Sequence, residues 1–364
     1  MHDHPDAGPG PSRRIAERAL RYGRMARFRG YDRTARALFR LALGLAPDLG
    51  LARRLLDIMA PRPPRALAHL QFVAFGTTGL CNASCIHCPT GKAATAHVPR
   101  STMPMEIFLK VIDGIVDERL AVISQMSFGL FGDGLVDPLV VERARHVRRK
   151  LPDVLLSVNT NGAAFNEARH APLRELAGVI ALHCESLDPA VFDRLMAPLR
   201  LKNVLPRYEA LLRTFPGMIR VSVPVSRANL PELPDIRRWF MDRGAQEVTF
   251  APLASRCAED RGLFDTLALA PQRIRCTPAI MSSLIVDCDG LVLPCCNDFA
   301  RSEPIGDLGR NGFRHVLRAA ERAAFAQKLA AGAHDAVPLC SRCYADLLTS
   351  DFPYDQLPAG PAAA

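Results

Sequence analysis

The sequence of 364 residues lacks the features that mark membrane, secreted and nucleic-acid-binding proteins. No apolar run approaches the roughly 18 to 20 residues of a membrane-spanning helix, and residues 1–11 are polar, unlike the apolar core of a secretory signal. Aromatic residues make up only 6% of the chain, with a single tryptophan, so no array of rings for stacking on bases is present. We therefore expect a cytoplasmic protein with no membrane partner.

Lysine is also scarce, with five residues beside 41 arginines, although the net charge is +9. Most of this excess lies in residues 1–70, which hold fourteen arginines, no lysine and six acidic residues. The excess is confined to one end, and no nucleic-acid-binding module is recognisable. The charge therefore predicts a solvated or partner-facing helical surface rather than a nucleic-acid site.

Cysteine, in contrast, is abundant, with eleven residues. In a long chain without a secretory signal, this number indicates metal or redox chemistry rather than disulfides. Two cysteines, Cys184 and Cys257, stand alone. The others form two groups, which are Cys81, Cys85 and Cys88, and then Cys276, Cys288, Cys295, Cys296, Cys340 and Cys343.

From about residue 68, short apolar or β-branched runs alternate with amphipathic stretches. Strands are predicted over 70–77, 121–129, 154–159, 179–184, 219–225 and 247–251. Helices are predicted between them, near 104–118, 138–150, 165–176, 205–214 and 233–243. This alternation is typical of βαβ units and a parallel sheet. We predict an α/β fold, a partial (β/α)6 barrel whose active-site groups lie where strands end and loops begin.

The barrel, at 67–258, is one of four predicted segments. Residues 1–66 predict a helical extension with one tetratricopeptide-like hairpin, which cannot bury its own apolar face. We expect it to cap the barrel; a docking surface for a peptide or protein partner is the alternative. Residues 259–350 predict a small cysteine-rich domain with a hairpin turning at Asp289-Gly290, and residues 351–364 predict a disordered tail.

The first cysteine group follows the first predicted strand at the spacing C-x3-C-x2-C. Thiolates hold iron–sulfur clusters, and three ligands on a cube of four irons leave one iron open. A zinc site that adds His87 or a distant ligand is the alternative. The triplet Cys81, Cys85 and Cys88 after a barrel strand resembles the radical SAM superfamily. That resemblance implies a catalytic [4Fe–4S] cluster whose open iron binds S-adenosylmethionine (SAM, or AdoMet) and cleaves it to a 5′-deoxyadenosyl radical.

Further segments extend this resemblance over roughly residues 70–345. Phe131-Gly132-Asp133-Gly134 lies where the family carries a Gly-Gly-Glu-like loop for the methionine amine, with aspartate in place of glutamate. The run from Val158 to Gly162 resembles the family's Thr-Asn-Gly segment. Two later loops fall where the family contacts the SAM carboxylate and ribose, with turn or helix capping as the alternative. The implied cofactor-binding residues are Gly132, Asp133, Gly134, Asn161, Ser186, Ser226 and Arg227.

The second cysteine group predicts another metal site. The segment from Cys276 to Cys295 reads C-x13-G-x4-C, and Cys340 and Cys343 form a distant C-x2-C pair. Adjacent Cys295 and Cys296 would point to opposite faces of a strand, and Cys295 has the matching spacing. These spacings resemble the SPASM and twitch extensions of radical SAM enzymes. They imply a twitch-type domain whose one auxiliary [4Fe–4S] cluster is held by Cys276, Cys295, Cys340 and Cys343; structural zinc is the alternative.

The resemblance implies hydrogen abstraction from a small polar substrate, such as a sugar, polyol or aminocyclitol, with flavodoxin or ferredoxin as electron donor. Electron transfer to the auxiliary cluster would give oxidation, whereas hydrogen return from a thiol would give epimerisation. Cys257 and Cys184 are the candidate catalytic donors, although buried cysteines often only fill space. Side chains that could bind substrate or transfer protons are His183, Glu185, Arg256 and Glu259.

Two other functions stay open. The protein could modify a ribosomally made peptide, with the basic N-terminal helices holding an acidic leader segment. Alternatively, it could be a non-catalytic zinc or cluster protein that acts through those helices. Analysis of iron and acid-labile sulfide separates the last hypothesis from the two enzymatic ones.

Overall fold

The computed structural model describes residues 10–28, 31–59, 69–258 and 261–346. The predicted tail at 351–364 and candidate Glu259 lie outside these residues. Among the described residues, no helix is both long and apolar enough to cross a bilayer.

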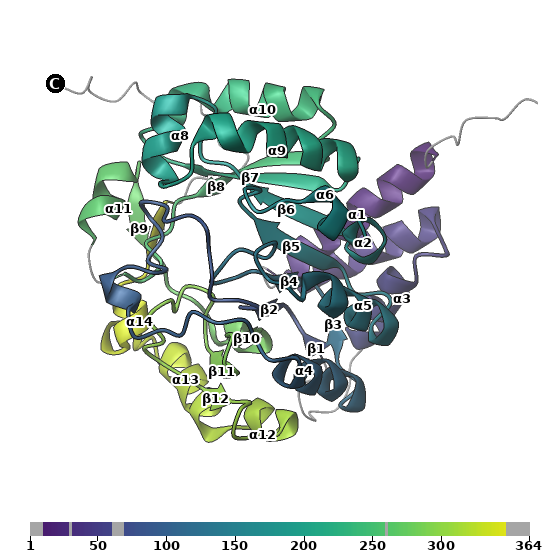
Figure 1. The fold of residues 1–364 in the computed structure, drawn as a ribbon. Coiled ribbons are helices and arrows are strands. Elements are labelled where there is room, and N and C mark those ends of the chain that lie inside the picture. The colour runs from purple at the N-terminus through teal and green to yellow at the C-terminus, as the bar shows by residue number, and fades with distance from the viewer. Residues whose placement is uncertain (1–9, 29–30, 60–68, 259–260, 347–364) are drawn as a thin grey trace, which may run out of the picture.

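Six adjacent parallel strands form one side of a nine-stranded sheet (Figure 1). In their order across the sheet they are β2 (Val73–Phe75), β4 (Met126–Phe128), β5 (Leu156–Thr160), β6 (Val179–His183), β7 (Ile219–Val225) and β8 (Glu247–Pro252). Each coincides with a predicted strand. Strand β8 is an edge of the sheet, so the barrel is open. The predicted partial (β/α)6 barrel is confirmed.

Helices connect the six strands and cover the sheet (Figure 1). They are α4 (Met105–Asp117), α5 (Val140–Lys150), α6 (Glu167–His170), α7 (Leu173–Leu176), α8 (Pro189–Leu195), α9 (Leu201–Thr214) and α10 (Leu233–Asp242). Their apolar residues recur at helical spacing; α4, for example, buries Phe108, Val111, Ile112 and Ile115. This one-sided burial fixes each helix against the sheet.

The helices differ from the prediction in two places. The single helix predicted over 165–176 is divided into α6 and α7 by Pro172, since proline has no N–H to continue the hydrogen-bond ladder. Helix α8 was not predicted. It begins where the Asp188 carboxylate accepts hydrogen bonds from the N–H groups of Ala190 and Val191, both at 2.9 Å.

The described part of residues 1–66 contains three helices, α1 (Pro11–Phe28), α2 (Asp32–Leu45) and α3 (Gly50–Ile58), of which α1 and α2 pack against each other. They lie against the end of the barrel at which its strands begin. Arg21 Nη1 is 2.8 Å from Glu247 Oε2 at the first residue of β8, and Arg24 Nε donates to the carbonyl oxygen of Ile123 at 2.9 Å. Part of the basic surface therefore contacts the barrel, and the division of the chain at residue 66 stays a prediction.

Phe39 of α2 is the residue on which this packing depends most. Its side chain is fully buried and packs with Leu55, Met59 and Ile123. We expect Phe39→Ala to lower the free energy of unfolding by about 3–5 kcal/mol, the usual effect of deleting a buried phenylalanine ring. Leu41→Ala on the same helix is the matched control, because Leu41 is 49% exposed. Equal urea denaturation midpoints for the two variants would contradict the cap.

The C-terminal region continues the barrel sheet. Strand β10 (Leu284–Val286) pairs in parallel with β2, and antiparallel β11 (Leu291–Leu293) and β12 (Gly306–Asp307) follow it. The predicted hairpin is confirmed, with its turn at Asp289-Gly290. Gly290 has a φ of +92°, a conformation that favours glycine.

Most of the remaining strands and α-helices are short. They are β1 (His69–Leu70), β3 (Ala121–Val122), β9 (Pro271–Arg273), β13 (Tyr344–Asp346), α11 (Gly262–Leu267), α12 (Phe313–Leu317), α13 (Ala320–Ala330) and α14 (Pro338–Ser341). A bridge between Ala254 and Ala345 places β13 beside the end of β8. The C-terminal region therefore contacts the six-stranded core at both edges, at β2 through β10 and near β8 through β13. The predicted division at 258/259 stays a prediction.

Candidate active site

A cavity of about 310 Å³ lies at the carboxyl ends of the barrel strands. Its walls come from the loop after β2, the glycine-rich loop after β4, the ends of β5 and β6, and the region after β8. Parallel α/β proteins bind their ligands at this edge. The candidate residues from the sequence that line the cavity are Cys81, Cys85, Cys88, Gly132, Asp133, Asn161, His183 and Arg256.

The cysteine triplet occupies one wall of the cavity, and all three residues are half-buried. The N–H of Ala83 donates to Cys81 Sγ at 3.4 Å. Lys92 Nζ fixes the same loop by donating to the carbonyl oxygens of Cys85 and Ile86, at 2.7 Å each. Burial raises the pKa of Cys81 to about 11 and raises the pKa of Cys85 further.

Thiols with raised pKa values stay protonated at neutral pH unless a metal supplies positive charge. A coordinating metal deprotonates such thiols outright. Three converging thiols on one cavity wall are therefore suited to hold three corners of a [4Fe–4S] cluster, as the sequence predicts.

In the loop after β4, two positions, Gly132 and Gly134, have no space for a side chain. A Cβ at Gly132 would lie 2.4 Å from the carbonyl oxygens of Thr78 and Leu80. A Cβ at Gly134 would lie 2.7 Å from the carbonyl oxygen of Asn159. These close approaches bring the backbone of the loop directly beside the cysteine loop, which is where a small ligand of the cluster would bind.

The side chain of Asp133 lies in the cavity wall and is hydrogen-bonded within the chain. Its buried carboxylate accepts hydrogen bonds from Thr160 Oγ1, at 3.0 and 3.1 Å, and from the N–H groups of Asn161 and Leu135, at 2.7 and 2.9 Å. Burial raises the pKa of Asp133, and these bonds oppose the rise. The side chain therefore ties the glycine-rich loop to the end of β5.

Asn161 links the cavity to the triplet. Its Nδ2 donates to Asn82 Oδ1 at 2.8 Å and lies 3.7 Å from Cys81 Sγ. Its Oδ1 accepts a hydrogen bond from the N–H of Ala163 at 2.9 Å. The amide is thus held in one orientation at the cavity wall.

The other implied SAM residues bond to their own surroundings and are not among the cavity-lining residues. Ser186 Oγ donates to Glu232 Oε1 at 2.5 Å, and Ser226 Oγ donates to Asn229 Oδ1 at 3.2 Å. Arg227 Nε donates to the carbonyl oxygen of Ala268 at 2.8 Å. These contacts stabilise the loops in which the three residues lie, and their role in binding SAM stays a prediction.

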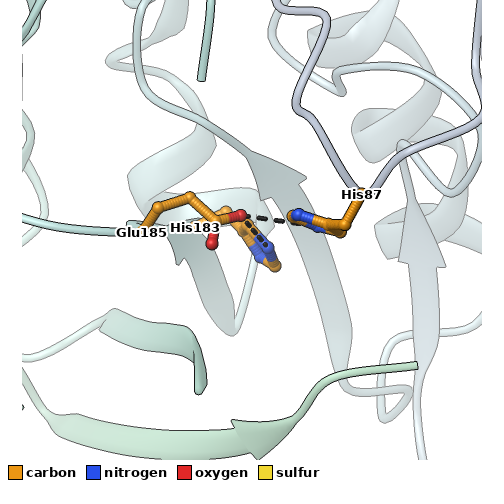
Figure 2. Close-up of side chains that lie close together, drawn as sticks. All are labelled: His87, His183 and Glu185. Carbon is orange, nitrogen blue, oxygen red and sulfur yellow. Dashed lines mark ion pairs between the residues drawn. The ribbon is translucent and has the colours of Figure 1, made fainter. Parts of the chain in front are cut away.

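A cluster of two imidazoles and a carboxylate lies at the same cavity (Figure 2). Glu185 Oε1 is 3.4 Å from His87 Nε2 and 3.7 Å from His183 Nε2. Burial lowers the pKa of His183 to about 4, with a further contribution from Arg256, and lowers the pKa of His87 well below its usual value. Burial also raises the pKa of Glu185 to about 8, against the opposing charge of Arg256.

Arg256 brings a positive charge to the cavity from the segment after β8. Its guanidinium carbon lies 5.0 Å from the centre of the Phe299 ring, a cation–π contact. Its Nε is buried without a hydrogen-bond partner. This donor is therefore available for an oxygen of a bound molecule.

A second pocket brings together the four cysteines predicted for the auxiliary site, Cys276, Cys295, Cys340 and Cys343. Its other walls are largely apolar, from Ile274, Ile280, Phe325, Leu329 and Leu339. Cys296 is exposed and does not line this pocket, and Cys288 is buried elsewhere, with Sγ 3.7 Å from Ser101 Oγ. The choice of Cys295 over Cys296 agrees with this arrangement.

Neither candidate hydrogen donor lines the large cavity. Cys257 lies in the auxiliary pocket, where a hydrogen bond with Cys343 raises the pKa of its thiol. Cys184 is fully buried, and its Sγ donates to the carbonyl oxygen of Ser186 at 3.4 Å. Burial raises the pKa of Cys184 as well. Both thiols are placed away from the space in which a substrate would bind.

Several cavity residues were not singled out from the sequence. Ala181 and Ser222 line it from β6 and β7, and Phe299 lines it from the C-terminal region. Every second side chain of a barrel strand faces the interior. Counting along the predicted strands could therefore have indicated Ala181 and Ser222. Nothing in the sequence indicated Phe299.

Comparisons with known proteins agree with this geometry. The SPASM family model, described as an iron–sulfur cluster-binding domain, matches residues 276–344. The structure of BtrN in complex with AdoMet and 2-DOIA superposes with a TM-score of 0.54 at 17% identity, over 75% of this chain and 92% of BtrN. The chain therefore shares its fold with BtrN, and residues 276–344 match the SPASM domain. The resemblance found in the sequence is thereby confirmed.

Other radical SAM structures superpose equally well. SuiB of Streptococcus suis bound to precursor peptide SuiA gives a TM-score of 0.56 at 9% identity, over 79% of this chain and 72% of SuiB. The anSMEcpe protein with bound AdoMet gives a TM-score of 0.52 at 14% identity, over 70% of this chain and 78% of anSMEcpe. At these identities the likeness concerns the fold.

A curated relative is the tungsten-containing aldehyde ferredoxin oxidoreductase cofactor-modifying protein of Pyrococcus furiosus. It is 22% identical over 158 residues, which are 42% of this chain and 43% of that protein. The match therefore spans less than half the length of the relative. The SPASM match, in turn, begins at Cys276 and ends one residue after Cys343, so it contains all four predicted auxiliary ligands.

Proposed function

We propose that this protein is a radical SAM enzyme that abstracts hydrogen from a small polar substrate, a sugar, polyol or aminocyclitol. The observation that carries the proposal is a single cavity with the thiols of Cys81, Cys85 and Cys88 on one wall and polar side chains on the others. A [4Fe–4S] cluster on those thiols would supply, together with SAM, a 5′-deoxyadenosyl radical. The chain's own residues would position SAM and the substrate.

The residues near the triplet are suited to hold SAM. The glycine-rich loop exposes backbone to the cavity and is fixed to β5 by Asp133, while Asn161 presents an oriented amide beside Cys81. Ser186, Ser226 and Arg227 would support the loops that surround this region. Arg256 Nε, in the same cavity, could donate a hydrogen bond to a substrate oxygen, because it has no partner within the described chain.

Oxidation is favoured over epimerisation. Epimerisation needs a hydrogen donor that reaches the carbon radical, and neither Cys184 nor Cys257 lines the cavity. Oxidation needs an electron acceptor instead. A second [4Fe–4S] cluster, held in the SPASM domain by Cys276, Cys295, Cys340 and Cys343, would serve as that acceptor, and a flavodoxin or ferredoxin would reduce the catalytic cluster.

Modification of a peptide is the second candidate function, because the structure of SuiB with a precursor peptide superposes well on this chain. The N-terminal helices are the expected place for a leader segment. They lie against the amino ends of the strands, whereas the cavity lies at the carboxyl ends. This separation favours the small-molecule substrate.

Anaerobic reconstitution with iron and sulfide tests the proposal. We expect about eight irons and eight sulfides per chain, as two cubes require. With SAM and dithionite, the protein should form 5′-deoxyadenosine, and deuterium from a deuterated aminocyclitol or sugar should appear in that product. Deuterium transfer from the Cα position of a peptide instead would favour peptide modification. Zinc without sulfide, and no 5′-deoxyadenosine, would overturn the enzymatic proposal.

A further inference from the structure

We propose that His87, His183 and Glu185 form a binding site for one divalent transition-metal ion, such as Zn²⁺ or Fe²⁺, in the wall of the cavity. None of its three ligands is a cysteine. His183 is the last residue of β6, and Glu185 stands two residues later, so the two side chains point to the same side of the extended chain. His87 approaches them from the loop after β2 (Figure 2).

The carboxylate of Glu185 lacks a satisfactory partner. Glu185 is 1% exposed, and its Oε1 atom is buried without a hydrogen-bond partner. The distances of 3.4 and 3.7 Å to the two imidazole nitrogens exceed the normal 2.7–3.2 Å range of a hydrogen bond. A buried carboxyl group without hydrogen-bond partners is destabilising, and a bound cation would satisfy it.

The spacing of the three donor atoms suits a single ion. Metal bonds of about 2.0–2.1 Å in tetrahedral geometry place neighbouring donors about 3.3 Å apart. The observed pairs at 3.4 and 3.7 Å are close to this value, and all three donors lie within 4.8 Å of one another. Two imidazoles and one carboxylate form the protein part of many catalytic zinc and non-haem iron sites, which keep further positions open.

The open positions of such an ion would face the substrate. His87 and His183 both line the cavity, and His87 stands between two cysteines of the triplet in the sequence. Resting on the proposed function, we infer that the ion binds a hydroxyl oxygen of the substrate next to the catalytic cluster. Coordination lowers the pKa of that hydroxyl, so its proton can pass to solvent while the oxygen stays on the metal. Arg256 would then bind a second oxygen.

Zinc binding to the fully reconstituted holoenzyme tests the site. We expect one zinc per chain by equilibrium dialysis, beyond the iron of the clusters. The zinc K-edge EXAFS should show nitrogen and oxygen neighbours at about 2.0–2.1 Å and no sulfur at about 2.3 Å. Sulfur scattering, or no bound zinc, would overturn the proposal. Formation of 5′-deoxyadenosine by the same sample would show that only this inference, and not the radical SAM function, has failed.

Substitution of the proposed ligands tests whether the zinc ion binds at these residues. Glu185→Gln and His183→Ala should each weaken zinc binding by at least about tenfold, since even the loss of an outer-sphere partner of a metal ligand commonly weakens binding 10- to 100-fold. Glu175→Gln, at an exposed position, is the matched control and should bind zinc as the wild type does. Iron and sulfide contents must equal those of the wild type, which excludes misfolding. Unchanged zinc affinity in Glu185→Gln would contradict the site even if the wild type binds zinc.

Discussion

Replacement of Cys81 by alanine is expected to abolish the formation of 5′-deoxyadenosine from SAM and dithionite. Cys81 is one of three thiols on the cavity wall, and two thiolates cannot hold a cube that needs three protein ligands and one open iron. Asn161 Nδ2 also lies 3.7 Å from Cys81 Sγ, so the substitution removes a contact of a residue that we propose binds SAM. We expect at least about a hundredfold loss, because removal of a direct ligand exceeds the 10- to 100-fold effect of losing an outer-sphere partner.

Cys288→Ala is the matched control for this experiment. Cys288 is a buried cysteine that lines neither the cavity nor the auxiliary pocket. Its alanine variant should keep the iron content and the 5′-deoxyadenosine formation of the wild type. Wild-type SAM cleavage by Cys81→Ala would refute the assignment of the catalytic cluster. Equal loss in both variants would indicate general misfolding, which the iron content of the auxiliary site would reveal.

The strands and the cysteine groups could be predicted from the sequence because they depend on local patterns. Short apolar runs at regular spacing predicted all six parallel strands, from Val73–Phe75 to Glu247–Pro252. The triplet spacing predicted thiols that converge in one loop, and they do lie on one cavity wall. In each case residues that are close in the sequence carry the information.

The direction of individual side chains could not be predicted in the same way. Ser186 and Ser226 follow strands, as SAM-binding residues would, but they bond to Glu232 and Asn229 in the folded chain. The cluster of His87, His183 and Glu185 joins a loop and a strand end almost a hundred residues apart. Such contacts depend on the packing of distant segments and have no signature in the sequence.

Cys257 shows how one turn changes the interpretation of a residue. Its position after β8 predicted a place at the mouth of the barrel. Arg256 and Cys257 have φ values of +54° and +52°, and the N–H of Ala258 bonds to the carbonyl oxygen of Ser255 at 3.1 Å. This is the pattern of a type I′ turn, which is uncommon without glycine or asparagine. Arg256 lines the cavity, whereas Cys257 lines the auxiliary pocket.

Adjacent Cys295 and Cys296 provide the second large expected effect. Cys295 lines the auxiliary pocket beside Cys276, Cys340 and Cys343, whereas Cys296 is exposed and lies outside that lining. We expect Cys295→Ala to lose about four irons and four sulfides per chain, the content of one cube. The same variant should still cleave SAM, because the catalytic triplet is intact, but it should not complete substrate oxidation.

Cys296→Ala is the natural control, since it removes the neighbouring thiol and leaves the pocket unchanged. It should keep about eight irons per chain and full turnover. Retention of all iron by Cys295→Ala together with loss in Cys296→Ala would reverse the ligand assignment. If Cys295→Ala keeps its iron because Cys257 takes the vacant place, the double variant with Cys257→Ala should lose it. That outcome would make Cys257 a reserve ligand, which its contact with Cys343 makes physically accessible.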